Sequence, residues 1–347
     1  MQIFTTYAEL LEQIKKMGHT PHVLSYAPDR VPIVYIKSGG AKEPAIFITA
    51  GSHSTEQAGV TAAVELITKL DTEHQVYVIP TRDPMGMNGY PYALSLALGE
   101  EPSINSFEEL EAILREQGEI FYDEDGILLV LIGDYGFANC NLLGRLKNAP
   151  AEILSPFKGR RIFTPVRRGG VEGTEHFQRA YTLIVSPSGK VLHLNRFHDT
   201  AWAPVEVRCA RRLMAEIQPG LSFDLHEAMD IEDRYWLSAR YQQDEENEAW
   251  EQRIARETIQ AIADSGAVLV EDNYSPGGFF TRSERGVYWL DANKRGEGLN
   301  LMDYAARFHG LAFGTEMGMY ARFEQRVTLG LLTVQSAVKV FEERYCT

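Results

Sequence analysis

The chain has 347 residues, of which 44% are hydrophobic and 24% are charged. This balance is typical of a folded globular protein and excludes a disordered or fibrous one. The formal net charge of -14 leaves no basic excess to neutralise phosphates, so we expect no nucleic-acid partner. The length allows either one large α/β domain with an insertion or two ordinary domains.

Membrane and secretory features are absent from the sequence pattern. Residues 1–20 mix charged residues into their apolar positions, which predicts an amphipathic helix and not a secretory signal. The apolar runs, such as 127–132, are far shorter than the roughly 18 residues of a membrane span, so we expect no membrane partner. Cys140, Cys209 and Cys346 are odd in number and far apart, which disfavours a disulfide framework and predicts a cytoplasmic protein. Nothing in the sequence determines the oligomeric state.

Strand-like and helix-like patterns alternate along the chain and predict a mixed α/β fold. Alternation of this kind favours a largely parallel central sheet with helices on both of its faces. After the N-terminal helix, the expected strands are 31–37, 45–50, 75–80, 221–225, 267–270 and 311–315. The expected helices are 60–70, 107–117, 205–217, 245–263 and 322–343.

The region from about residue 88 to residue 180 has a less regular pattern. It contains the acidic helix 107–117, the apolar run 127–132 and a Gly/Arg-rich stretch. We interpret 88–180 as an inserted subdomain or lid within a single catalytic domain that spans 1–347. Two Gly-rich segments, 275–280 and 294–298, are candidate mobile loops.

The segment AIFITAGSHSTEQAG is an apolar strand that ends in small residues and is followed by a helix. It delivers His53 and Glu56 to the carboxyl end of the strand, where ligands gather in open α/β sheets. An imidazole and a carboxylate at this spacing can converge on one cation, and nitrogen and oxygen donors suit Zn²⁺. Taken alone, such a pair is more often solvated surface than a metal site.

A second apolar strand, GLSFDLHEAMD, carries His226 to its end. Asp224 lies two residues earlier and therefore on the same face of the strand, where it can orient a metal-binding histidine. By itself, His226 is more often a buried structural histidine. Two strand ends that each carry a histidine make the metal hypothesis stronger.

A third strand, LAFGTEMGMY, presents Glu316 near its end. A carboxylate there can take a proton from water and pass it to a leaving amine. The alternative for Glu316 alone is a cap on the following helix. His53, Glu56, His226 and Glu316 are thus all expected at the carboxyl ends of strands.

The order of these motifs resembles the zinc metallocarboxypeptidase family, the carboxypeptidase A-like enzymes. That family carries HxxE after a strand, a later Asn-Pro-Asp-Gly turn, an Asn-Arg pair, a histidine at a distant strand end and a glutamate near the C-terminus. Here the matching positions are His53 to Glu56, Asp83 to Gly86, Asn195-Arg196, His226 and Glu316. The resemblance implies a zinc carboxypeptidase-like fold with one Zn²⁺ per chain on His53, Glu56 and His226.

The resemblance also implies roles around the metal. Asn195 and Arg196 would grip the free carboxylate of the substrate, and Glu316 would be the general base and acid. A further family arginine stabilises the oxyanion, and Arg179 has the most similar spacing. The family tyrosine before the catalytic glutamate has no clear counterpart, because Tyr288 and Tyr304 only flank that position.

The sequence therefore predicts an enzyme, a zinc metallohydrolase that cleaves a peptide or amide bond next to a free carboxylate. The motif set is also similar to the aspartoacylase and succinylglutamate desuccinylase branch, so an N-acyl amino acid is the alternative substrate to a peptide. A non-catalytic zinc-site binding protein is a second alternative. A nucleotide-binding function has no support, since no GxGxxG follows a strand and no Walker-type loop is present.

Overall fold

The computed structural model describes residues 1–140, 146, 149–165, 172, 176–274, 280–291 and 298–345. The candidate mobile loops at 275–280 and 294–298 lie almost wholly outside these residues, as does Cys346. Within the described residues, no helix is long and apolar enough to cross a membrane.

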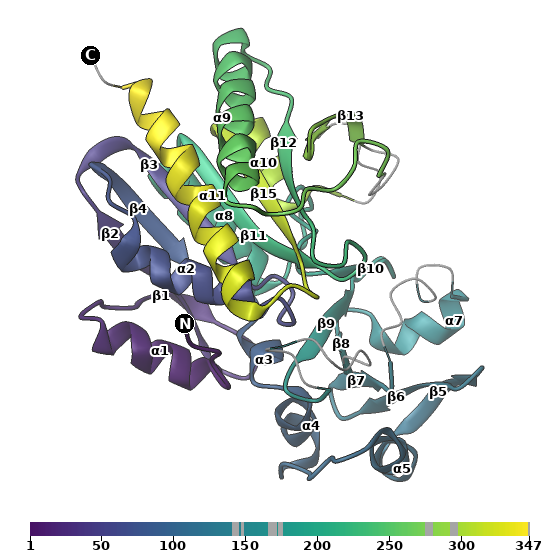
Figure 1. Cartoon of the computed structure of the whole chain (residues 1–347). Helices are drawn as coiled ribbons and strands as arrows, with labels where there is room; N and C mark the ends of the chain where they lie inside the picture. Colours follow the sequence, from purple (N-terminus) through teal and green to yellow (C-terminus); the bar gives the residue numbers. More distant parts are fainter. Residues whose placement is uncertain are drawn as a thin grey trace.

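Two sheets organise the described chain (Figure 1). The larger has nine strands in the order β1-β2-β4-β3-β11-β15-β12-β14-β13. Its strands are β1 (His22–Tyr26), β2 (Pro32–Gly39), β3 (Lys42–Ala50), β4 (His74–Ile79), β11 (Leu221–Ala228), β12 (Tyr235–Arg240), β13 (Phe280–Glu284), β14 (Val287–Leu290) and β15 (Leu311–Gly318).

Helices cover both faces of the large sheet, as the alternation of patterns predicts. One hydrophobic core joins the sheet to α1 (Tyr7–Lys16), α2 (Gln57–Lys69), α9 (Glu245–Asp264) and α11 (Phe323–Glu343). A second core joins its other face to α4 (Tyr90–Leu98), α5 (Phe107–Gln117), α8 (Val205–Ile217) and α10 (Leu301–Phe308). In β3, Ile46 and Ile48 face the first core while Phe47 faces the second, because successive side chains point to opposite faces. A strand buried on both faces reads as a continuous apolar run, which is how the sequence shows β3.

The expectation of a largely parallel sheet holds only at its centre. The neighbouring pairs β4–β3, β3–β11 and β11–β15 are parallel. The flanks are mixed: β1–β2, β2–β4, β12–β15 and β13–β14 are antiparallel, while β12–β14 is parallel. Only residues 229–234 join β11 to β12, too few for the crossover of a dozen or more residues that a parallel return requires.

The second sheet has six strands in the order β10-β9-β8-β7-β6-β5 and lies beside the carboxyl ends of the large sheet's central strands (Figure 1). Its strands are β5 (Glu119–Glu124), β6 (Ile127–Ile132), β7 (Tyr135–Ala138), β8 (Arg161–Pro165), β9 (Ala180–Val185) and β10 (Val191–His193). The short helices α3 (Pro84–Met87) and α7 (Ala151–Leu154) and the 3₁₀ helix Ser155–Phe157 complete the described elements. The second sheet thus runs past residue 180, the predicted end of the insertion.

Capping chemistry explains why two of the predicted helices begin where they do. The side chain of Ser106 accepts a hydrogen bond from the backbone N–H of Glu109, and Asp244 does the same for Asn247. Such bonds satisfy backbone donors that have no partner inside the helix. One predicted strand is wrong: residues 267–270 make only an isolated bridge between Leu269 and Tyr235.

Candidate metal centre

His53 and Glu56 lie in the tight connection between β3 and α2. Gly51 has φ of +60°, a conformation that favours glycine, and an added Cβ would meet the side chain of Thr81. The backbone N–H of Glu56 donates to the carbonyl of His53 at 3.1 Å, which folds the turn. The turn places both side chains at the carboxyl end of β3.

His226 reaches the same edge from β11. The parallel pairing of β11 with β15 sets His226 directly opposite Glu316. Asp224 lies two residues before His226 and shares its face of the strand. The central strands therefore deliver two histidines and two glutamates to one place.

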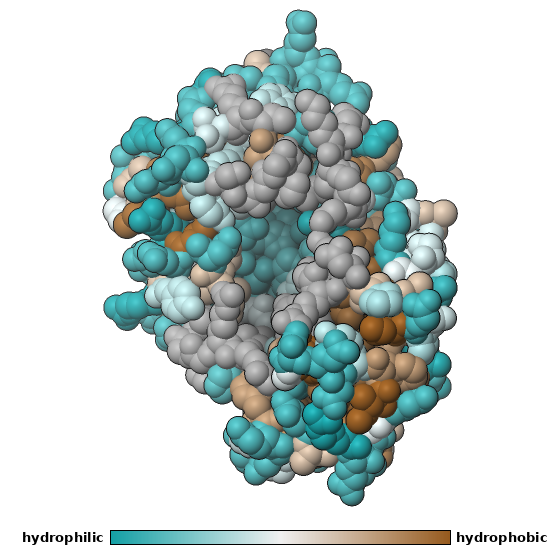
Figure 2. All heavy atoms as spheres, turned by 90° about the vertical axis from the view of Figure 1, so that its right-hand side faces the viewer, coloured by the Kyte–Doolittle hydropathy of each residue, from teal (hydrophilic) through white to brown (hydrophobic). Residues whose placement is uncertain are grey.

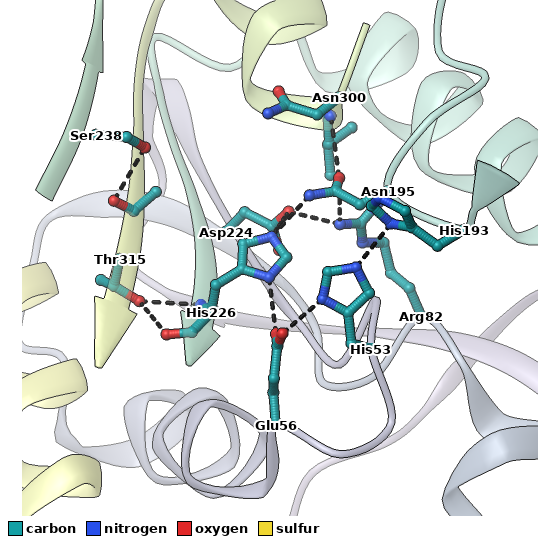
Figure 3. A network of polar contacts seen from close by, with 12 residues as sticks. His53, Glu56, Arg82, His193, Asn195, Asp224, His226, Ser238, Asn300 and Thr315 are labelled. Carbon is teal, nitrogen blue, oxygen red and sulfur yellow. Dashed lines mark hydrogen bonds and ion pairs between the residues drawn. The ribbon is translucent and has the colours of Figure 1, made fainter. Parts of the chain in front are cut away.

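The carboxylate of Glu56 lies between the two histidine rings (Figure 3). Its Oε1 is 2.5 Å from Nδ1 of His53, and its Oε2 is 2.7 Å from Nδ1 of His226. One ligand atom from each of the three residues lies within 4.8 Å of the others. The three side chains sequence analysis proposed as metal ligands thus converge in the structure.

The second nitrogen of each ring faces a protein group. Nε2 of His226 is 2.8 Å from Oδ2 of Asp224 and 2.8 Å from Nδ2 of Asn195. Nε2 of His53 is 2.7 Å from Nδ1 of His193. Groups that engage one ring nitrogen fix the orientation of the ring and leave the other nitrogen for a metal. Two imidazoles and a carboxylate are also the donor set of known zinc enzymes, so the residues fit Zn²⁺.

Charges within this cluster shift the pKa values of its members. Burial alone would raise the pKa of Glu56, but His53 and His226 outweigh it and lower that pKa. Burial alone would lower the pKa of His226, but Asp224 and Glu56 raise it well above its ordinary value. The cluster therefore favours a carboxylate at Glu56, the form that binds a cation.

A buried arginine, Arg82, supports the cluster from behind. Its Nη2 donates to Oδ2 of Asp224 at 2.5 Å and to Oδ1 of Asn195 at 3.0 Å (Figure 3). Burial alone would raise the pKa of Asp224, but Arg82 and His226 together lower it well below its usual range. Asp224 is thus held as an acceptor for His226.

Glu316 stands beside this cluster with its carboxyl partly open to a cavity. Burial raises the pKa of Glu316 well above its ordinary value, although His226 opposes the shift. The hydrogen bonds found among the described residues include none to this carboxyl. A carboxyl with a raised pKa beside a candidate metal site is a candidate for proton transfer.

The cavity has a volume of about 230 Å³ and opens beside these groups. Figure 2 shows a hollow with a hydrophilic floor on the face of the molecule that lies to the right in Figure 1. Asn195 and Arg196 both line the cavity, and Nη1 of Arg196 donates to the carbonyl of Asn195 at 2.8 Å. Its other lining residues are His53, His193, Asp224, His226, Trp236, Ser238, Arg240, Phe280, Asn300, Met302, Gly314, Thr315 and Glu316.

The structure does not bring Arg179 to the cavity. Its guanidinium is buried against the N-terminal segment, where it donates to the carbonyls of Phe4 and Thr5 and to Oε1 of Gln57. Burial lowers its pKa to about 10. These bonds tie β9 to the chain start, so the expected role of Arg179 in oxyanion stabilisation has no support in this geometry.

Neither flanking tyrosine lines the cavity. The hydroxyl of Tyr288 donates to the carbonyl of Glu271 at 2.9 Å, and the ring of Tyr304 packs beside His198.

Three further residues contribute to the cavity or its support but were not indicated by the sequence patterns: Arg82, His193 and Arg240. Arg82 follows β4 at the same sheet edge as His53, so the strand-end rule would have found it. His193 ends β10, a short strand that was not predicted. Arg240 lies on β12, which was not predicted.

Comparison with known structures defines the class of fold. The chain has the fold of carboxypeptidase A-like metallopeptidases, as the motif order implies. No family model and no curated protein sequence matches the chain.

The structural relatives are distant in sequence. A proposed metallopeptidase from Shewanella denitrificans OS217 has a TM-score of 0.54 and 12% identity, over 96% of this chain and 87% of that one. A metallo-carboxypeptidase from Burkholderia cenocepacia has a TM-score of 0.51 and 12% identity, over 98% of this chain and 69% of that one. A metallo-carboxypeptidase from Pseudomonas aeruginosa, in complex with (2-guanidinoethylmercapto)succinic acid, has a TM-score of 0.51 and 13% identity. The match covers 97% of this chain and 68% of that one.

Proposed function

We propose that this chain is a zinc-dependent hydrolase that cleaves a peptide or amide bond next to a free carboxylate. The observation that carries the proposal is the convergence of His53, Glu56 and His226 at one sheet edge, with Glu316 opposite His226 on the next strand. Fold similarity to metallo-carboxypeptidases supports the same reading.

His53, Glu56 and His226 would hold one Zn²⁺. When bound, Zn²⁺ supplies Lewis acidity, which lowers the pKa of water and polarises a carbonyl. Asp224 and His193 would keep the two rings oriented, because each lies within hydrogen-bonding distance of the Nε2 atom of a histidine.

Glu316 would move the proton. Its carboxylate accepts a proton from water while the water oxygen bonds to the carbonyl carbon. It then donates that proton to the amide nitrogen as the C–N bond breaks and the amine leaves. Glu316 lies opposite His226 and lines the cavity, and this position supports its role in both steps.

Arg196 would bind the substrate carboxylate, because a guanidinium offers two parallel donors to it. The carbonyl of Asn195 helps to hold that guanidinium in the cavity wall. The side-chain amide of Asn195 is engaged with Arg82 and His226, so we assign Asn195 the positioning of Arg196 alongside any contact with substrate.

The second sheet would form one wall of the cavity. His193 ends β10, and Asn195 and Arg196 follow directly after it. Strands β5 to β8 of this sheet lie within the predicted insertion 88–180 of the single catalytic domain. We therefore propose that the insertion, through the sheet it shares with β10, limits the size of the substrate.

The test is hydrolysis of a panel by zinc-loaded and chelator-treated protein. The panel contains peptides with free carboxyl ends, the same peptides with amidated ends, and N-acyl amino acids. We expect zinc-dependent cleavage of the free peptides. Cleavage of N-acyl amino acids alone would favour the deacylase alternative, and zinc binding without any turnover would favour the non-catalytic one.

Arg196→Ala sharpens the test. It should reduce cleavage of the free peptides and leave the slow cleavage of amidated ones unchanged. Arg208 on the exposed side of α8 offers the control, and Arg208→Ala should behave as the unaltered protein. Equal losses on both kinds of peptide in Arg196→Ala would remove the exopeptidase assignment.

A further inference from the structure

The cavity continues along the face of the large sheet, away from the strand ends that carry the metal centre. Ser238 of β12 pairs with Gly314 of β15, two residues before Glu316 in the sequence. Arg240 lies two residues further along β12, and Asn300 caps the nearby helix α10. The residues named here line the same cavity as His226.

Arg240 is buried, but its polar contacts leave one side of the guanidinium weakly engaged. Nε donates to Oδ1 of Asp303 at 3.1 Å, and Nη1 donates to Oγ of Ser238 at 2.7 Å. The bond from Nη2 to Oδ1 of Asn300 is 3.4 Å long, at the outer limit for a hydrogen bond. Nη2 is therefore the atom of Arg240 best able to receive an acceptor from the cavity.

Two more donors in the cavity wall donate to no acceptor among the described residues. The indole Nε1–H of Trp236 is buried and unpaired. Oδ1 of Asn300 accepts from the backbone of Asp303 and from Arg240, but its Nδ2 makes no hydrogen bond in the described part of the chain. Buried donors without acceptors are costly, so this wall is suited to a ligand that brings acceptors.

Gly314 provides the room for this arrangement. A Cβ at this position would lie 2.6 Å from Oγ of Ser238 and 3.9 Å from Nη1 of Arg240. A larger residue would thus displace the hydroxyl that fixes the guanidinium.

We propose that Arg240, Asn300 and Trp236 form a subsite for the side-chain carboxylate of an acidic residue at the cleaved end of the substrate. This inference rests on the proposed function and names its substrate class, a chain that ends in glutamate or aspartate. Arg196 would take the terminal carboxylate and Arg240 the second one, so two guanidinium groups serve two anions.

The charge balance around Arg240 is consistent with an incoming anion. Asp303 meets the Nε side of the guanidinium and leaves Nη2 to the cavity. Glu251 lies close to Arg240 through its backbone contact, but burial raises the pKa of Glu251 to about 8, so most of it is uncharged at neutral pH. Asp303, at the Nε side of the guanidinium, is then the main negative charge in contact with Arg240.

The experiment measures binding of free amino acids to the zinc-loaded protein by calorimetry. L-Glutamate and L-glutamine have nearly the same shape and differ in side-chain charge. We expect glutamate to bind about 10- to 100-fold more tightly than glutamine, the usual range for a hydrogen bond to a charged group. Leucine and lysine should bind more weakly than glutamate. Equal binding of glutamate and glutamine, or tighter binding of leucine, would overturn the subsite.

Variants assign the preference to Arg240. Arg240→Met should abolish the difference between glutamate and glutamine, while Arg208→Met should leave it intact. Arg240→Met removes the cation that faces Oδ1 of Asp303 and so risks misfolding. Arg240→Lys is therefore the second variant. It keeps a positive charge beside Asp303 but loses the planar donors, so the preference for glutamate should shrink. If Arg240→Lys kept the full preference for glutamate over glutamine, Arg240 would not be the residue that binds the side-chain carboxylate.

The same panel separates the subsite from the proposed function. Peptides that end in glutamate, glutamine, leucine and lysine are compared for zinc-dependent cleavage. Cleavage of all four at equal rates would keep the hydrolase and discard the subsite. No cleavage, with glutamate still bound more tightly than glutamine, would discard the hydrolase and keep the anion site.

Discussion

The two faces of β11 each carry a buried carboxylate paired with an arginine, yet only one face serves the site. Asp224 pairs with Arg82 on the cavity side, where it also meets His226. Glu227 pairs with Arg326 on the opposite side and accepts a hydrogen bond from the backbone of Ala58 at 2.7 Å. Burial and pairing are therefore no guide to function by themselves, and what separates the two carboxylates is access to the cavity.

The difference also favours Glu316 over Glu227 as the proposed carrier of the proton. Glu227 is next to His226, the proposed metal ligand, in sequence, but alternation along β11 turns it toward α2 and α11. Glu316 reaches the cavity from the neighbouring strand. We therefore expect changes at Glu316 to affect chemistry and changes at Glu227 to affect folding.

The largest expected effect is on turnover in Glu316→Gln. The amide keeps the shape of the side chain but cannot accept a proton, so turnover should fall by roughly 10² to 10⁴. Zinc content, measured by elemental analysis, should stay unchanged. Glu227→Gln is the matched control, and its turnover per folded molecule should equal that of the unaltered protein. A Glu316→Gln variant with normal turnover would show that another group transfers the proton.

Glu227→Gln should instead lower the free energy of unfolding. Loss of one partner from a buried ion pair leaves Arg326 uncompensated, which costs about 3–5 kcal/mol. Denaturant unfolding followed by circular dichroism gives the value. If Glu227→Gln lost zinc but kept its stability, the assignment of Glu227 to folding and of the opposite face of β11 to the site would be wrong.

Asp224→Asn should weaken zinc binding by about 10- to 100-fold, the usual effect of losing a group that orients a metal ligand. The affinity is measured by competition with a chromophoric chelator. An affinity equal to that of the unaltered protein would mean that Asn195 alone can hold the ring of His226.

A separate effect concerns the pH dependence of stability, through Glu251 on α9. Burial raises its pKa from 4.5 to about 8, although backbone donors from β12 and β15 oppose the shift. Because the unfolded chain loses this proton first, stability from this group is full below pH 4.5 and is lost as pH rises to about 8. Glu251→Gln cannot ionise, so its denaturation midpoint should fall less over this pH range. A fall as steep as that of the unaltered protein would exclude Glu251 as the source.

Sequence patterns predicted the parts of the fold and site that depend on local order. Periodicity located α5 and α8 at their observed bounds, and strand ends located His53, Glu56, His226 and Glu316. The resemblance to carboxypeptidase A-like enzymes is confirmed at the level of the fold. The assignment of catalytic and metal roles stays a prediction, as does the cytoplasmic location inferred from the cysteines.

Features that depend on distant pairing were out of reach. Arg179 has the spacing of a family arginine, but the added strands of the second sheet carry it to the N-terminal segment. The strand-end rule places Arg82 at the edge of the sheet, but its contact with Asp224, 142 positions away, exists only after folding. The subsite around Arg240 depends on β12, whose short return from β11 leaves no distinct pattern.

Elemental analysis of zinc in purified protein is the most direct test of the central claim. We predict about one Zn²⁺ per chain in the unaltered protein and its loss in His226→Ala, because two ligands cannot replace three. His309 lies away from the cavity with its Nδ1 3.3 Å from Gln218, so His309→Ala should keep the metal. Full zinc occupancy in His226→Ala would contradict the proposed metal centre.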